Sequence, residues 1–327
     1  MRKSNFKHLI VSLALLMVGS ATAITIESKN QQIELDKNKG YFEGDVKVQV
    51  GNVVVQSPRA DLDLEPKTKK PSLATFFDKP YAHQTKDNKK HEVKADIIKV
   101  SLINKVITAQ GNAQTNVLQN KQPIIIITAD EQEYDTQTNL MKATGSVVIN
   151  YEDMLATSDN AYALLNKQGD VQNIKLSSRA TIKQDKSIIK GDNIQYSALR
   201  QDIIVSCNTM SYVTFENGDR VIVNARNQQY DRRANTIMAT GAVNVKYADY
   251  SAIGPKAVMY INPKTNKPDK ILFIGRSKIT EKGVNSVEAD KITMTMEPKT
   301  FEADGNVKTT IEQGSDNNNK NKMEFSL

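Results

Sequence analysis

Apolar and polar positions alternate along most of the chain, and the alternation continues through glycines inside the apolar runs. Around Gly241 the two faces separate as follows: Ile237, Ala239, Val243, Val245 and Tyr247 on one, and Met238, Thr240, Asn244 and Lys246 on the other. The runs around Gly44 and Gly305 repeat the pattern. A period of two is typical of a half-buried β-strand, and the 3.6-residue period of a helix is absent. The sequence therefore predicts an all-β protein.

A unit of about 33 residues repeats along the chain. Its first motif has an apolar residue, a small residue and a glycine at alternate positions, as in MKATGSV (141–147) and IMATGAV (237–243). The positions equivalent to the glycine are 44, 78, 111, 145, 178, 207, 241, 275 and 305. An interleaved motif begins with Asp, which we expect to cap turns at strand starts, at Asp61, Asp96, Asp130, Asp159, Asp192 and Asp290. Such regular spacing predicts a repeat architecture.

Each unit supplies about two strands, so nine units predict roughly 16–18 strands in mostly antiparallel succession. Glycine inside a strand marks a bulge, a bend or a close backbone approach. Strands that bend at one level give a folded, slotted sheet with an apolar interior. The sequence leaves open whether that interior is filled, as in a sandwich, or open as a trough.

Composition removes several classes of function. The 327 residues include one cysteine (Cys207), three histidines and no tryptophan, which leaves no disulfide framework and no CxxC site. The formal net charge of +7 falls to about +4 without the basic residues of the first segment, too weak for nucleic-acid binding. We therefore predict no enzyme, no cofactor, no metal and no nucleic-acid partner.

The first segment has the organisation of an export signal. Residues 1–23 contain a basic start, an apolar run from Leu9 to Val18 and small residues at Ala21 and Ala23. This pattern is typical of a cleaved signal peptide, and the apolar run is too short to span a bilayer. We expect the folded part to cover residues 24–312, as one module or two, followed by a polar flexible tail at 313–327.

The export signal followed by A-D-x-x-x-Y-D and x-A-x-G-x-V units resembles the OstA-like (LptA-like) periplasmic lipopolysaccharide transport proteins. The strongest likeness lies in TADEQEYDTQTNLMKATGSVVI (128–149) and NARNQQYDRRANTIMATGAVNV (224–245). The resemblance implies a periplasmic β-jellyroll whose slotted apolar interior shields lipid A acyl chains. It also implies edge-to-edge partners: related β-jellyroll domains of the inner-membrane adaptor and the outer-membrane translocon, and head-to-tail copies of the chain.

The candidate lipid-binding residues are the inward apolar positions near the glycines. They are Phe42, Val46, Val48, Ile107, Val147, Ile149, Val205, Ile237, Val243, Val245, Ile271, Phe273, Phe301 and Val307. Each one has an alternative explanation as ordinary core packing.

Two further features carry weaker hypotheses. The basic stretches 65–71 and 86–94 could contact lipid phosphates or be solvated loops, and His83 with His91 is only a weak metal signal. The segments at 24–35 and 303–312 are expected to be exposed sheet edges. If the interior is filled, the alternative is an exported β-repeat structural protein or adhesin without lipid cargo.

Overall fold

The computed structural model describes residues 24–312, except residues 51, 87–88, 152, 167–170, 185, 215–217, 219 and 266. The predicted signal peptide and polar tail lie outside these residues. The described chain contains strands and no helix, so the all-β prediction is confirmed. Correspondingly, none of its segments is a helix that could span a membrane.

The chain divides into two compact units between Ile182 and Lys183, and each is described by itself. The N-terminal unit contains β1 (Ile24–Glu27), β2 (Asn30–Glu34), β3 (Lys39–Val50), β4 (Val53–Leu64), β5 (Pro71–Phe77), β6 (Tyr81–Lys86), β7 (Lys89–Lys94), β8 (Ile97–Ser101), β9 (Val106–Gln119), β10 (Gln122–Asp135), β11 (Leu140–Tyr151) and β12 (Met154–Leu165). The division falls within β13 (Val171–Gln184).

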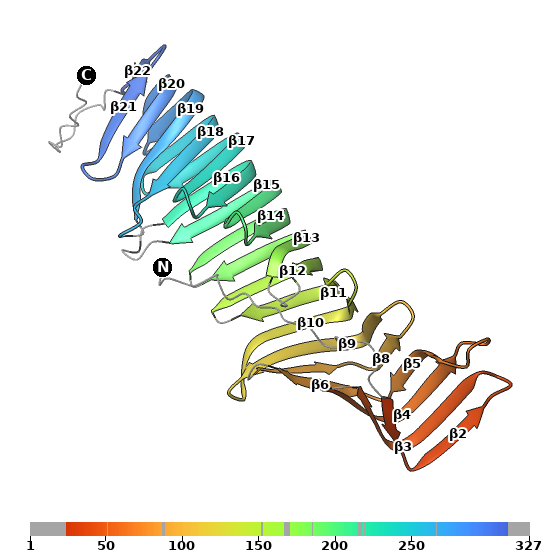
Figure 1. Ribbon diagram of the computed structural model, residues 1–327. Coiled ribbons are helices and arrows are strands. Elements are labelled where there is room, and N and C mark those ends of the chain that lie inside the picture. The colour runs from red at the N-terminus through yellow and green to blue at the C-terminus, as the bar shows by residue number, and fades with distance from the viewer. Residues whose placement is uncertain are drawn as a thin grey trace. The chain divides into compact units, whose positions relative to one another are not determined.

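The C-terminal unit is built in the same way, and its long strands follow one another in chain order (Figure 1). Its strands are β14 (Ser187–Ser197), β15 (Asp202–Thr214), β16 (Arg220–Asp231), β17 (Thr236–Tyr247), β18 (Tyr250–Ile261), β19 (Pro268–Glu281), β20 (Asn285–Thr295), β21 (Thr300–Asp304) and β22 (Lys308–Thr310).

Neighbouring strands pair antiparallel, as predicted. The described chain has 22 strands rather than the expected 16–18. The excess arises where one long strand is interrupted at its bend: β1 and β2 both pair with β3, and β21 and β22 both pair with β20. The pairs β5–β6 and β7–β8 are divided in the same way.

All nine predicted glycine-equivalent positions lie in the left-handed region of backbone space. Their φ values run from 64° to 85° at Gly44, Asp78, Gly111, Gly145, Ser178, Cys207, Gly241, Gly275 and Gly305. Strand pairing shifts register at these points, for example between Thr240 and Val243. Each position is therefore a bulge that bends its strand, and the predicted bend is confirmed.

At several bends the glycine backbone lies against an aspartate side chain that precedes it by 15 residues. A Cβ on Gly145 would lie 2.0 Å from Asp130 Oδ2, and one on Gly111 would lie 2.4 Å from Asp96 Oδ2. The repeated aspartates therefore sit opposite bends, and Asp130 lies inside β10 rather than at its start. The assignment of Asp61 to the repeated aspartates is also wrong. In β4 the residue opposite the bend is Pro58, between Ser57 and Arg59.

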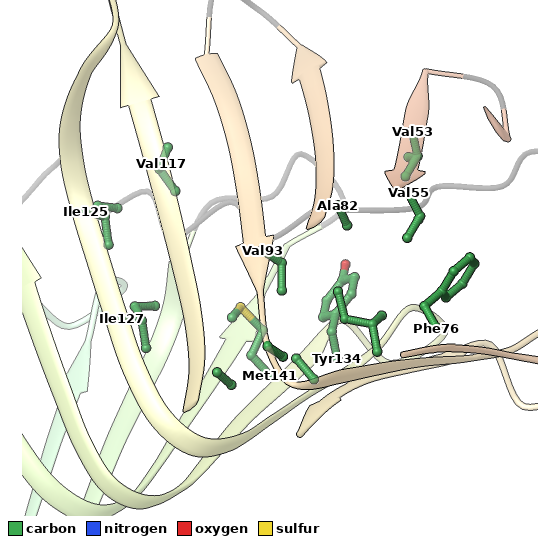
Figure 2. Packing of buried hydrophobic residues seen from close by; sticks show 14 of the residues in the cluster. Val53, Val55, Phe76, Ala82, Val93, Val117, Ile125, Ile127, Tyr134 and Met141 are labelled. Atoms are coloured by element: carbon green, nitrogen blue, oxygen red, sulfur yellow. The ribbon is translucent and has the colours of Figure 1, made fainter. Parts of the chain in front are cut away.

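Each bent strand has two arms. Arm A is the half of each strand that pairs in register with the segment before the bend, Lys39–Glu43 in β3 and Thr236–Thr240 in β17. Arm B is the half that pairs in register with the segment after the bend, Val46–Val50 in β3 and Val243–Tyr247 in β17. Apolar side chains from both arms of the N-terminal unit form one buried cluster. Val93 on arm B and Tyr134 on arm A point into the same interior (Figure 2). The C-terminal unit has its own buried cluster, centred on Ile271, Phe273 and Ile292.

The bend at Cys207 supports a stability prediction. Cys207 is exposed and holds φ at 65°, a conformation that costs a residue with a Cβ roughly 1–2 kcal/mol. Glycine adopts it freely but loses more entropy on folding. We expect Cys207→Gly to stabilise the protein by roughly 0.5–1 kcal/mol, measured by urea denaturation. Cys207→Ala keeps the Cβ and should give no gain; an equal gain from both variants would contradict the backbone explanation.

Candidate functional site: an apolar interior between the arms

The N-terminal unit contains an apolar hollow that opens between its arms. Its volume is about 60 Å³, and its wall combines Ile26, Val48 and Val50 of arm B with Phe42 and Phe76 of arm A. Apolar atoms make up nearly all of the lining because the inward positions of each strand alternate with polar outward ones. The hollow therefore offers a surface suited to a hydrocarbon chain.

A smaller hollow of about 20 Å³ lies in the same unit. Val53, Val55 and Val100 line both spaces, so the two are neighbours. The smaller hollow reaches Thr115 and Gln132, which are buried polar side chains. The interior thus changes from almost wholly apolar near Ile26 to partly polar at Gln132.

The buried glutamine is a device that both units contain. In the N-terminal unit Thr115 Oγ1 donates to Gln132 Oε1 at 2.6 Å, and Gln132 Nε2 donates to the carbonyl oxygens of Ala113 and Ile127. Those carbonyls lie beside the bulge between β9 and β10. The glutamine therefore links the backbones of β9 and β10 beside the bend.

The C-terminal unit repeats this arrangement around Gln228. Its Oε1 accepts from Ser211 Oγ at 2.7 Å and from the Tyr230 hydroxyl at 2.8 Å. Its Nε2 donates to Thr209 Oγ1 and to the carbonyl of Val223. Burial raises the pKa of Tyr230, so its hydroxyl stays protonated and keeps donating.

Most of the predicted lipid-binding residues face the interior. Nine are buried: Phe42, Val46, Val48, Val147, Val205, Val243, Val245, Ile271 and Phe273. Four are half-buried and pack against a core cluster: Ile107, Ile149, Ile237 and Phe301. Phe42 and Val48 line the larger hollow, and Ile107 lines the smaller one. Their contact with lipid stays a prediction.

Val307 is placed differently from the prediction. It is 51% exposed, whereas Val147 and Val243, at the same distance after their bends, are buried. Val307 lies in the gap between β21 and β22, on the last described strand pair of the unit. Within the described residues no further strand covers it, and an inward position in the repeat is therefore exposed here.

Several interior residues are not among the predicted ones. Phe76 and Ile98 are almost fully buried, and Val53 and Val55 line both hollows. All four lie in alternating apolar runs, and this alternation alone indicates that they face the interior. Gln132 and Gln228 occupy the same place in two copies of the Asp motif, which is a signal that the repeat alignment contained.

The basic stretch at 86–94 is mainly strand β7 rather than a loop. Lys90 Nζ lies 2.7 Å from Glu92 Oε1 and donates to the Tyr81 hydroxyl at 2.9 Å. In the stretch at 65–71, Lys69 Nζ donates to the carbonyl of Leu35. Both lysines therefore have partners within the protein. No group of three or more metal-ligating side chains occurs among the described residues.

Bent antiparallel strands around an apolar interior are consistent with the predicted β-jellyroll. Residues 25–124 match the family model "LptA/(LptD N-terminal domain) LPS transport protein". This match covers under a third of the chain and supports the OstA-like, LptA-like family that the motifs predict.

Among solved structures, the chain is similar to LptH from Pseudomonas aeruginosa, described as the LptA homologous periplasmic component of the conserved lipopolysaccharide transport device. The sequence identity is 16%, and the match covers 38% of this chain and 84% of LptH with a TM-score of 0.33. No curated protein matches the chain.

Proposed function

We propose that this protein binds the acyl chains of lipopolysaccharide in its apolar interior and carries the lipid across the periplasm. The observation that carries the proposal is the apolar hollow between the arms of the N-terminal unit. All of its lining residues except Ile24 lie within the stretch that matches the lipopolysaccharide transport family. The family also supports a periplasmic location and a binding function rather than catalysis.

The physical task is one that an apolar interior can perform without chemistry. Exposing a 14-carbon acyl chain to water costs about 10 kcal/mol, because each of about 12 methylenes contributes ~0.8 kcal/mol. An apolar path removes most of that cost. Directional movement then requires energy from a partner rather than a catalytic residue in this chain.

The hollow is smaller than a typical ligand site, which occupies roughly 300–1,000 Å³. At about 60 Å³ it holds no complete acyl chain, so binding requires the two arms to separate. The same small volume favours a second candidate, an exported structural protein or adhesin with a filled core. The two candidates differ in whether lipid reaches the interior.

Both ends of the described fold support edge-to-edge assembly. At the N-terminal edge, β2 is mostly exposed and carries Ile33 at 57% exposure. At the other edge, β22 is exposed, and Ile311 follows it at 61% exposure. Edge strands with exposed apolar side chains are templates for pairing with another chain. We propose related β-jellyroll domains or further copies of this chain as the partners.

A photo-crosslinking amino acid at Val48 tests the proposed function. Val48 lines the hollow, whereas Gln49 is exposed on the opposite face of the same strand. We expect lipopolysaccharide to crosslink at position 48 and not at position 49 in the purified protein. Absence of a crosslink at position 48, together with an unchanged melting curve, would favour the filled-core candidate.

A further inference from the structure

In the C-terminal unit, side chains from the far ends of the two arms contact each other. We call this place, where Tyr250 and Phe301 meet, the mouth of the unit. Tyr250 begins β18 at the tip of arm B, where it is in register with Tyr247 and Glu281. Phe301 lies on β21 in arm A, in register with Met294. The rings of Tyr250 and Phe301 are 5.0 Å apart at an angle of 46°. This tilted contact joins the two arms at the mouth.

Tyr250 also contacts a lysine and a carboxylate. Lys299, in the turn before β21, places its Nζ 4.4 Å from the centre of the Tyr250 ring and 5.8 Å from that of Tyr247. The Tyr250 hydroxyl donates to Glu281 Oε1 at 2.9 Å. Burial, and then the bond to Glu281, raise the pKa of Tyr250 to about 12. The hydroxyl therefore remains a donor at neutral pH.

The contacts lie directly over the apolar interior. Tyr247, Tyr250, Met296 and Phe301 are half-buried and pack against the buried cluster of the C-terminal unit. Val245, one inward position deeper than Tyr247, is only 4% exposed. An acyl chain that reaches Val245 between the arm tips must displace the Tyr250–Phe301 contact.

We propose that Tyr250, Phe301 and Lys299 form a latch that controls the access of acyl chains to the interior of the C-terminal unit. The latch rests on the proposed function for its ligand, but its opening can be measured without lipid. Separating the arms at this mouth breaks one ring contact, the two cation–π contacts of Lys299 and the packing of Tyr250. Removing the Tyr250 ring should therefore make the interior more accessible.

Thiol labelling tests the opening of the latch. The reporter is Val245→Cys in a Cys207→Ser background, which removes the native exposed thiol. We expect Tyr250→Ala to raise the labelling rate at position 245 roughly tenfold. Tyr250→Phe keeps the ring contact and should stay within roughly twofold of the parent. An unchanged rate in Tyr250→Ala would overturn the proposal.

Two controls separate the latch from general loosening. Tyr260→Ala removes another tyrosine of β18 that also carries a lysine over its ring, with Lys270 Nζ at 4.8 Å, but on the outer face. It should leave the labelling rate unchanged. A second reporter, Ala289→Cys, is at a fully buried position next to Asp290, which lies opposite the bend at Gly305. If Tyr250→Ala accelerates labelling equally at positions 245 and 289, the unit has loosened as a whole and the latch is wrong.

Lipopolysaccharide distinguishes failure of the latch from failure of the proposed function. Protection of Val48→Cys by lipopolysaccharide reports on lipid binding in the N-terminal unit. Protection there without any effect of Tyr250→Ala at position 245 would overturn the latch alone. Faster labelling in Tyr250→Ala with lipid protection at neither position would support the latch and overturn the lipid function.

Discussion

Gly145→Ala is expected to destabilise the N-terminal unit by about 3 kcal/mol, measured by urea denaturation followed by circular dichroism. Two penalties combine at this position. Gly145 holds φ at 79°, where a residue with a Cβ is strained by roughly 1–2 kcal/mol. The added Cβ would also lie 2.0 Å from Asp130 Oδ2 and 2.8 Å from Asp130 Cβ, so rotation of the carboxylate alone cannot make room.

Gly283→Ala is the matched control for backbone strain. Gly283 holds φ at 77°, and a Cβ there would meet no atom within 4 Å. It should therefore cost only the roughly 1–2 kcal/mol of the backbone term. In the Asp130→Gly background, which removes all three contacting atoms, Gly145→Ala should fall to the same cost. Equal costs for Gly145→Ala and Gly283→Ala in the otherwise unchanged protein would show that the close approach to Asp130 is unimportant.

The bends could be predicted because each of them occupies the same place in nine copies of the repeat. A single serine or cysteine in a strand gives no sign of a left-handed backbone. Ser178 and Cys207 were assigned to bends only by their spacing from glycines, and both have positive φ. The same averaging produced the error at Asp61, because β4 has Pro58 where copies such as the one at Asp130 have the aspartate.

The sequence predicts which side chains face the interior, but not the size of the space between the two arms. Alternation identifies which side chains point inward, and it placed Phe42, Val48 and Phe273 correctly. It does not reveal how closely the arms approach, because that distance depends on the side chains of both arms together. The hollow at the N-terminal mouth and the Tyr250–Phe301 contact at the C-terminal mouth both depend on it.

Gln228→Leu is expected to destabilise the C-terminal unit by about 3–5 kcal/mol, measured by urea denaturation. Leucine has a similar size, so the loss comes from polar groups rather than from a cavity. The Ser211 hydroxyl, the Tyr230 hydroxyl and the Val223 carbonyl all lose a partner inside the fold. Each buried polar group left without a partner costs roughly 1–3 kcal/mol.

The neighbouring Gln229 provides the control for Gln228. It is half-buried on the opposite face of β16, and its Nε2 makes one bond of 3.3 Å to Asp202. Gln229→Ala should cost less than about 1 kcal/mol. In the Gln228→Leu background, Ser211→Ala should cost nothing further, since its partner is already gone. If Gln228→Leu proves as mild as Gln229→Ala, the buried network does not stabilise the bend. The bulge itself must then fix the register of β15 against β16.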